Sequence, residues 1–113
     1  MSRGIGVVVY PVGDVGAAKE LYGKLLGIEP YADQPYYVGF KVGDQEIGLD
    51  PNGHENGLTG PTVFFRVDDI RSSLQSLAAA GAQTEQEPTD VGGGRLIARV
   101  GDADGNTIGL MQG

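Results

Sequence analysis

The sequence predicts an α+β fold in which one βαβββ unit occurs twice, forming a curled mixed sheet, or cup, with the helices packed outside. The first observation is an internal repeat. Three pairs of segments occur in the same order along the chain: Val7–Asp14 with Thr62–Asp69, Leu26–Ile28 with Ala80–Ala82, and Ile47–Leu49 with Ile108–Leu110. The second observation is that each copy contains an apolar run followed by Val, one residue and Asp. An ordered set of matches indicates duplication of a structural unit.

The first copy contains the patterns of each expected element. An apolar run over 7–10 predicts a strand, and Asp14 can cap a following helix. Gly27 can end that helix in a left-handed conformation. Strands are expected over 36–42 and 46–50, with a turn at residues 43–44 between them. The residues at helical spacing that predict the buried face of the helix are Val15, Ala18, Leu21, Tyr22 and Leu25.

The second copy repeats this pattern. A strand is expected over 63–67, then a helix capped by Asp68 or Asp69 and ended by Gly81. A short strand over 82–86 is followed by Pro88 and Gly92–Gly94, which predict a mobile connection. Strands over 95–100 and 107–111 flank a tight turn over 102–106. The predicted buried face of the second helix is Ile70, Leu74, Leu77 and Ala78.

The two copies are expected over 4–52 and 60–113. The polar segment between them, 50–61, is too short to be a free linker between distant domains. We therefore expect one domain spanning 1–113.

Composition restricts the function. The 113 residues include no cysteine, which excludes disulfides and cysteine nucleophiles. Acidic residues outnumber basic ones 15 to 8, and the basic residues are scattered, which argues against nucleic-acid binding. The net charge of −7 serves solubility or attracts a cationic ligand. No apolar stretch is long enough to span a membrane, and a cytoplasmic location is the default expectation.

The order of these motifs resembles the vicinal-oxygen-chelate superfamily, which includes glyoxalases, bleomycin-resistance proteins and extradiol dioxygenases. In that superfamily the first helix ends in a pattern similar to Tyr22 followed by Leu25-Leu26-Gly27 in this chain. The superfamily's terminal hairpin is similar to the segment 102–106, Asp-Ala-Asp-Gly-Asn, before Ile108-Gly109-Leu110. Ala103 stands where that family usually has proline. The resemblance covers nearly the whole chain.

The resemblance implies a ligand site inside the cup and, in metal-dependent members, four metal-ligand positions. These correspond here to Val7, Gly48, Thr62 and Gly109, and they supply no competent ligand set. We therefore expect no metal and no cofactor. Glu46 and Asp50 flank Gly48 with the same strand parity. With His54, they form the alternative set of metal ligands.

Side-chain alternation predicts the residues that line the cup. Gly48 and Gly109 are expected to leave space inside it. Arg66 can pair with Glu46 or Asp50, grip an anionic or carbonyl group of a ligand, or be exposed. His54 is expected to be a solvated loop residue and otherwise a base at the cup mouth. The predicted ligand-binding residues are Val7, Val9, Tyr37, Glu46, Gly48, Asp50, Thr62, Phe64, Arg66, Gly109 and Met111.

The sequence and the resemblance together leave three alternative functions. The leading one is metal-independent binding of a small organic molecule, cationic or aromatic, similar to drug sequestration by bleomycin-resistance proteins. The second is a glyoxalase- or dioxygenase-type enzyme with a noncanonical site, so the sequence leaves open whether the chain is an enzyme and names no catalytic residue. The third is an accessory dimer whose cup is vestigial. The resemblance also implies a homodimer.

Overall fold

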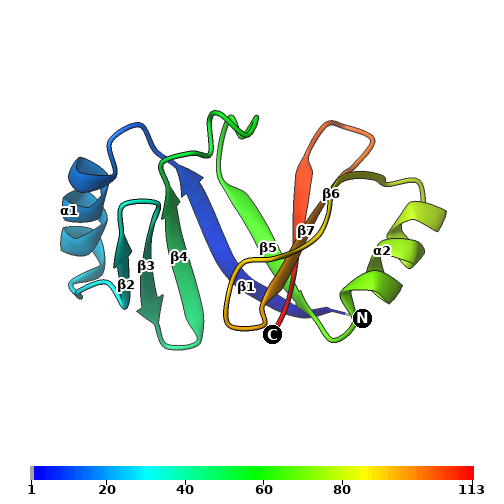
Figure 1. The fold of residues 1–113 in the computed structure, drawn as a ribbon, viewed down its shortest axis with the longest axis horizontal. Coiled ribbons are helices and arrows are strands. Elements are labelled where there is room, and N and C mark those ends of the chain that lie inside the picture. The colour runs from blue at the N-terminus through cyan, green and yellow to red at the C-terminus, as the bar shows by residue number, and fades with distance from the viewer. Residues whose placement is uncertain (1) are drawn as a thin grey trace. The chain divides into compact units, whose positions relative to one another are not determined.

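The computed structural model describes residues 2–113, which form two compact units (Figure 1). The N-terminal unit is Val7–Thr62, and the C-terminal unit is Val63–Gly113 together with the first residues up to Gly6. Strand β1 (Ser2–Pro11) therefore contributes residues to both units.

The N-terminal unit contains most of β1 and four further elements. They are α1 (Val15–Leu26), β2 (Ala32–Gln34), β3 (Tyr37–Val42) and β4 (Gln45–Asp50). The strand order is β2-β3-β4-β1. β1 runs parallel to β4, whereas β3 is antiparallel to both β2 and β4.

The C-terminal unit has the same topology. It contains β5 (Thr62–Val67), α2 (Ile70–Ala79), β6 (Gln83–Asp90), β7 (Leu96–Gly101) and β8 (Thr107–Gln112), in the strand order β1-β5-β8-β7-β6. β5 runs parallel to β8, and β7 is antiparallel to β6 and β8. The predicted α+β class with a mixed sheet is confirmed, because both units repeat the βαβββ connection.

Equivalent aspartates begin the two helices. Asp14 accepts a hydrogen bond from Ala17 N at 3.0 Å, and Asp69 accepts one from Ser72 N at 3.1 Å. Each carboxylate satisfies an amide that has no partner within its helix. Asp69, not Asp68, is thus the cap of α2. At the other end of α1, Gly27 adopts a left-handed φ of 69° and donates to the Gly23 carbonyl.

One helix face of the N-terminal unit differs from the prediction. Val15, Ala18 and Tyr22 pack toward the buried side chains Val38, Phe40 and Leu49, as expected. Leu21 and Leu25 do not, since they are 67% and 75% exposed. Leu26 packs in their place, because the sheet meets a stripe along 15, 18, 22 and 26. Tyr22 fixes this orientation by packing on Tyr10, with ring centroids 5.2 Å apart.

α2 buries more of its residues than α1 does. Ile70 and Leu74 are buried, and Leu77 packs against the same cluster, which confirms most of the predicted face. Ala78 was wrongly included, because it is exposed and Ser73 is buried in its place. The cluster also contains Val67, Ala98, Val100 and Leu110.

Three strands differ from the sequence prediction, and the first is β1, which begins at Ser2 and not at Val7. β2 was missed because it has only three residues, and they are mostly polar. β6 continues through Pro88 to Asp90, although Pro88 was expected in a mobile connection. The strand tolerates proline because β6 pairs only with β7 and its register shifts between Gln86 and Thr89. Gly92–Gly94, all with positive φ, form the turn into β7.

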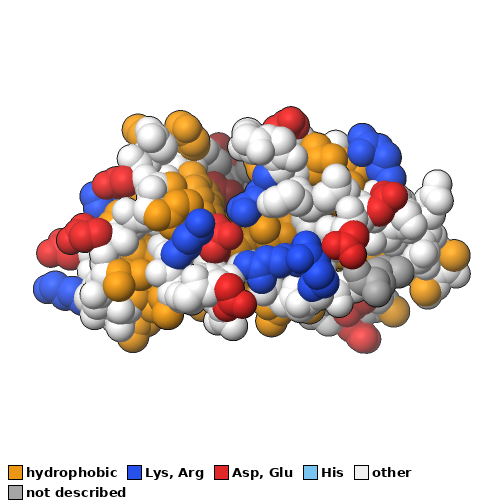
Figure 2. Space-filling model, turned by 90° about the horizontal axis from the view of Figure 1, so that it is seen from below, with side chains coloured by type: hydrophobic (Ala, Val, Ile, Leu, Met, Phe, Trp, Pro, Cys, Tyr) orange, Lys and Arg blue, Asp and Glu red, His pale blue; other side chains and the backbone are white. Residues whose placement is uncertain are grey.

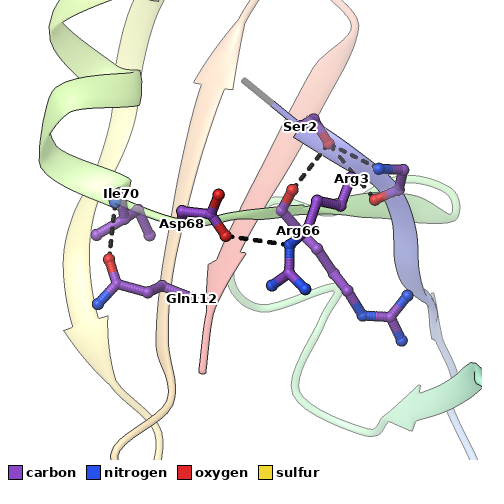
Figure 3. Close-up of polar contacts among 7 residues, drawn as sticks. Ser2, Arg3, Arg66, Asp68, Ile70 and Gln112 are labelled. Carbon is purple, nitrogen blue, oxygen red and sulfur yellow. Dashed lines mark hydrogen bonds and ion pairs between the residues drawn. The ribbon is translucent and has the colours of Figure 1, made fainter.

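Polar side chains fasten the corner between β5 and α2 (Figure 3). Ser2 Oγ donates to the Arg66 carbonyl at 2.8 Å, and Arg3 pairs with Asp68 at 3.1 Å. Gln112 Oε1 accepts a hydrogen bond from Ile70 N at 2.8 Å. This contact ties the last strand to the first turn of α2. None of the helices described in residues 2–113 is long and apolar enough to cross a membrane.

Candidate ligand-binding faces

Each unit packs its helix on one sheet face, and the opposite face, which the helix of that unit does not cover, is here called its open face. In the N-terminal unit, strand register aligns Val7 with Glu46 and Val9 with Gly48. Gly48 also lies opposite Gly39 on β3. Because side chains alternate along a strand, these residues share a face with Tyr37, Lys41 and Asp50. The structure thus brings six predicted site residues onto the N-terminal open face: Val7, Val9, Tyr37, Glu46, Gly48 and Asp50.

The space expected above Gly48 is filled. A side-chain carbon at this position would overlap the Tyr37 hydroxyl and lie 2.9 Å from its ring. The prediction that Gly48 leaves room for a ligand was therefore wrong. The missing side chain allows the Tyr37 phenol to lie directly against the strand backbone.

A second tyrosine, which the sequence prediction missed, covers Gly39. A side-chain carbon at Gly39 would lie 2.9 Å from the Tyr31 ring. The Tyr31 hydroxyl donates to Glu46 Oε1 at 2.5 Å, and Glu46 is only 5% exposed. Lys41 places its ammonium 4.8 Å from the centroid of the same ring. No strand pattern could identify Tyr31, because it precedes β2 in the connection from α1. The glycine at position 39 was the available signal.

The C-terminal open face follows the same principle. Phe64 is paired in register with Gly109, and its Cγ would lie 2.6 Å from a side-chain carbon placed there. The space expected at Gly109 is thus occupied by the Phe64 ring. Met111 and the Arg66 stem lie in the same way against Gly6. The predicted residues Phe64, Arg66, Gly109 and Met111 therefore share this face.

Arg66 and its neighbours hold polar partners on this face. Arg66 Nη1 donates to the Ile5 carbonyl at 2.9 Å, so part of its hydrogen-bonding capacity orders the first strand. Arg99 Nε donates to Gln86 at 2.8 Å, and Thr107 donates to Glu85 at 3.0 Å. These contacts add polar groups to a face otherwise lined by Phe64 and Met111.

The remaining predicted residues differ in environment. Thr62 is buried, with 2% of its surface exposed. Asp50 Oδ1 accepts a hydrogen bond from Asn52 N at 2.8 Å and so shapes the turn that follows β4. His54 is exposed, as expected for a loop histidine.

The residues present do not fit the metal that the resemblance implies. Val7, Gly48 and Gly109 have no side-chain donor atoms, and the rings of Tyr37 and Phe64 lie against the two glycines. A divalent metal needs several side-chain donors converging at about 2.0–2.3 Å. The alternative set of Glu46, Asp50 and His54 is not assembled either, since no group of three or more His, Cys, Asp or Glu in residues 2–113 could hold an ion.

A separate groove of about 570 Å³ lies beside α1, on the helix side of the N-terminal sheet. Gly16, Gly23 and Gly27 line it, and Phe40 contributes to its floor. Lys19 lies at this groove and pairs with Asp33, and the hydrogen bond to Asp33 raises the pKa of Lys19. None of the predicted site residues lines this groove.

Charged groups are interspersed on the surface. Figure 2 shows one face, on which acidic and basic side chains lie among apolar ones and do not form an extended basic patch.

The sequence matches the model of a known family over residues 4–110, almost its whole length. The chain belongs to the glyoxalase/bleomycin resistance protein/dioxygenase superfamily. The resemblance inferred from its motifs is therefore confirmed.

Solved structures of this superfamily share the fold. A superfamily member from Vibrio splendidus 12B01 matches with a TM-score of 0.71 and 18% identity, covering 95% of this chain and 97% of that one. Streptomyces coelicolor methylmalonyl-CoA epimerase, in complex with 2-nitronate-propionyl-CoA, matches with a TM-score of 0.80 and 17% identity. The match covers 99% of this chain and 95% of the epimerase chain. The Mn(II)-bound glyoxalase from Novosphingobium aromaticivorans matches with a TM-score of 0.74 and 21% identity. The match covers 98% of this chain and 39% of the glyoxalase chain. A comparison with curated proteins finds no match.

Proposed function

We propose that this superfamily member binds a small organic molecule on its open sheet faces without a metal ion. The observation that carries the proposal is the replacement of metal-ligand positions by glycines covered with the rings of Tyr37 and Phe64. An aromatic ring and apolar side chains with few polar groups are typical of organic-ligand sites. A ligand that stacks on these rings needs no Lewis acid to bind.

The lining favours an aromatic or cationic ligand. The N-terminal open face contains the Tyr37 ring and the Glu46 carboxylate, which is 5% exposed, and the C-terminal open face contains the Phe64 ring and the Met111 thioether, which are 6% and 3% exposed. Aromatic pairs contribute about 0.5–1.5 kcal/mol beyond the burial of their area. Sequestration of such a ligand requires only this surface and no catalytic group.

A vestigial binding face in an accessory dimer is the second candidate. It is favoured by the same rings, since Tyr37 and Phe64 fill space that the glycines would otherwise leave. In that case the rings stay in place and no ligand displaces or stacks on them. The two candidates differ in whether small molecules perturb these faces.

Assembly and location belong to the same proposal. We infer a single domain, because β1 contributes residues to both units. A homodimer is expected from the family resemblance and is tested by light scattering during size-exclusion chromatography. A cytoplasmic location is tested by cell fractionation.

The test is a screen of small aromatic and cationic molecules against isotope-labelled protein in EDTA, followed by amide NMR. We expect hits that shift β1, β3, β4, β5 or β8. Tyr37→Ala should change their affinity, whereas Tyr36→Ala should not, because Tyr36 is 65% exposed and lies just before β3. Hits that appear only after metal addition, or none at all, would reject the proposal.

A further inference from the structure

We propose that Tyr31 and Glu46 form a binding site for an organic ammonium group, and that Lys41 is its tethered competitor. This inference rests on the proposed function and names the ligand class for the N-terminal open face. It depends on three residues of one unit, from the α1–β2 connection, β3 and β4.

Lys41 shows that the Tyr31 ring accepts a cation. Its ammonium nitrogen lies 4.8 Å from the ring centroid, within the roughly 6 Å at which a ring face attracts a positive charge. Both side chains are exposed, Tyr31 by 48%. An ammonium ligand can therefore exchange with the lysine from solvent, replacing one positive charge by another.

Glu46 strengthens this attraction. The Tyr31 hydroxyl donates to its carboxylate at 2.5 Å, a length typical of a charge-assisted hydrogen bond. Donation toward an anion increases the electron density of the phenol ring, and the carboxylate adds a negative charge beyond its hydroxyl edge. Since Glu46 is 5% exposed, water screens that charge weakly. Lys41 is also the strand neighbour of Glu46 in register.

Gly39 holds the ring in place. The hydroxyl end of the Tyr31 ring lies 2.9–3.0 Å from where a Gly39 side-chain carbon would stand, and Tyr31 N donates to the Gly39 carbonyl at 2.9 Å. Any side chain at position 39 would push the ring off the strand and away from Glu46. Gly39 is thus a positioning residue for this site.

The class of ligand is inferred from how strongly water hydrates the competing cations. A quaternary ammonium attached to an apolar body is less strongly hydrated than the Lys41 ammonium, so it loses less on leaving water. The same ring face is the usual recognition element for such groups. A neutral ligand of the same shape gains nothing from Glu46 and does not compete with Lys41.

The experiment titrates the full chain with benzyltrimethylammonium and with neopentylbenzene, its neutral isostere, and with benzyl alcohol as a soluble neutral reference, followed by NMR of the Tyr31 ring and the backbone amides. We expect the cation to bind more tightly than either neutral molecule and to shift Tyr31, Gly39 and Glu46. Lys41→Gln should tighten cation binding about two- to five-fold, the scale of an exposed cation–π contact. The matched control, Lys24→Gln on α1, should leave it unchanged.

Two further variants test the partners. Glu46→Gln should weaken cation binding by about tenfold, because it removes a buried opposite charge. Tyr31→Phe keeps the ring but loses the hydrogen bond, so it should fall between the wild type and Tyr31→Leu. Unchanged dispersion of the amide spectrum shows that each variant is folded.

The outcomes separate the inference from the proposed function. Equal binding of the cation and its neutral isostere, with no effect of Lys41→Gln, would overturn the ammonium site while leaving small-molecule binding intact. Binding of none of these probes, with no hit in the wider screen, would overturn both. Cation binding that maps away from Tyr31 also rejects the site.

Discussion

The two units share one topology but pack their helices differently. α2 buries Ile70, Ser73 and Leu74, whereas no residue of α1 is fully buried. In the described residues, the cluster of the C-terminal unit has six buried side chains with four partly buried ones packed against it, whereas the N-terminal cluster around Phe40 has three buried and seven partly buried. Duplication thus preserved the backbone connection while the side chains diverged. We infer that the core between helix and sheet in the N-terminal unit depends on fewer fully buried side chains.

The largest expected effect is at Phe40. Phe40→Ala removes a fully buried ring from the N-terminal cluster and should lower the free energy of unfolding by about 3–5 kcal/mol. Urea unfolding followed by circular dichroism measures the loss. Val42→Ala, at a position 48% exposed on the same strand, is the control and should change little. A loss below about 1 kcal/mol at Phe40 would contradict the dependence of the N-terminal unit on its few fully buried side chains.

The helices can be compared with one residue type. Leu74→Ala in α2 should cost about 2–4 kcal/mol, since the side chain is 8% exposed. Leu25→Ala in α1 should stay within about 0.5 kcal/mol, because that side chain is 75% exposed. Thermal and urea unfolding measure both. Equal losses at the two positions would remove the proposed difference between the units.

The two glycines covered by aromatic rings, Gly109 and Gly48, should differ less in the stability that an alanine substitution costs. Gly109→Ala meets the base of the Phe64 ring, which cannot swing away easily, and should cost about 1–3 kcal/mol. Gly48→Ala meets the outer end of Tyr37, which can move, and should cost less. Combining Gly109→Ala with Phe64→Leu should recover part of the loss. Chemical denaturation of the three variants checks this order, and a larger cost at Gly48 would reverse the interpretation.

The helix caps should respond alike, since they are equivalent. Asp14→Ala and Asp69→Ala each remove one carboxylate–amide hydrogen bond and should cost about 1 kcal/mol. Asn at either position retains an acceptor and should restore most of the loss. Differential scanning calorimetry compares the pairs, and clearly unequal costs would show that the caps are not equivalent.

The smallest effect depends on pH. Hydrogen bonds from Asn106, both side chain and backbone, lower the pKa of Asp102 below its ordinary value of 3.8. A lowered pKa in the folded state adds stability above the unfolded value, and this stability is lost as the pH falls through the folded value. Unfolding measured between pH 5 and about 2 should therefore depend less on pH in Asp102→Asn. An unchanged pH dependence would count against this effect.

The sequence predicted the backbone better than the faces. Asp14, Gly27 and the apolar runs act through local rules, so their helices and strands could be placed. Leu21 and Leu25 were misplaced, because helical spacing identifies a stripe but not which edge of it meets the sheet. Pro88 was misjudged because edge position depends on strand order.

The candidate site shows a similar limit. Strand parity placed Val7, Val9 and Glu46 together correctly. It could not show that Tyr37 and Phe64 fill the space at the glycines, since that depends on side-chain rotamers. Tyr31 reaches Glu46 from an irregular connection, which no periodicity describes.

The measurement that tests metal-independent binding most directly is calorimetric titration of the EDTA-treated protein with Mn(II), paired with titration of the best organic hit in EDTA. We predict no saturable Mn(II) site and saturable binding of the organic ligand, with an affinity that Mn(II) does not alter. A stoichiometric Mn(II) site that the organic ligand requires for binding would contradict the proposal.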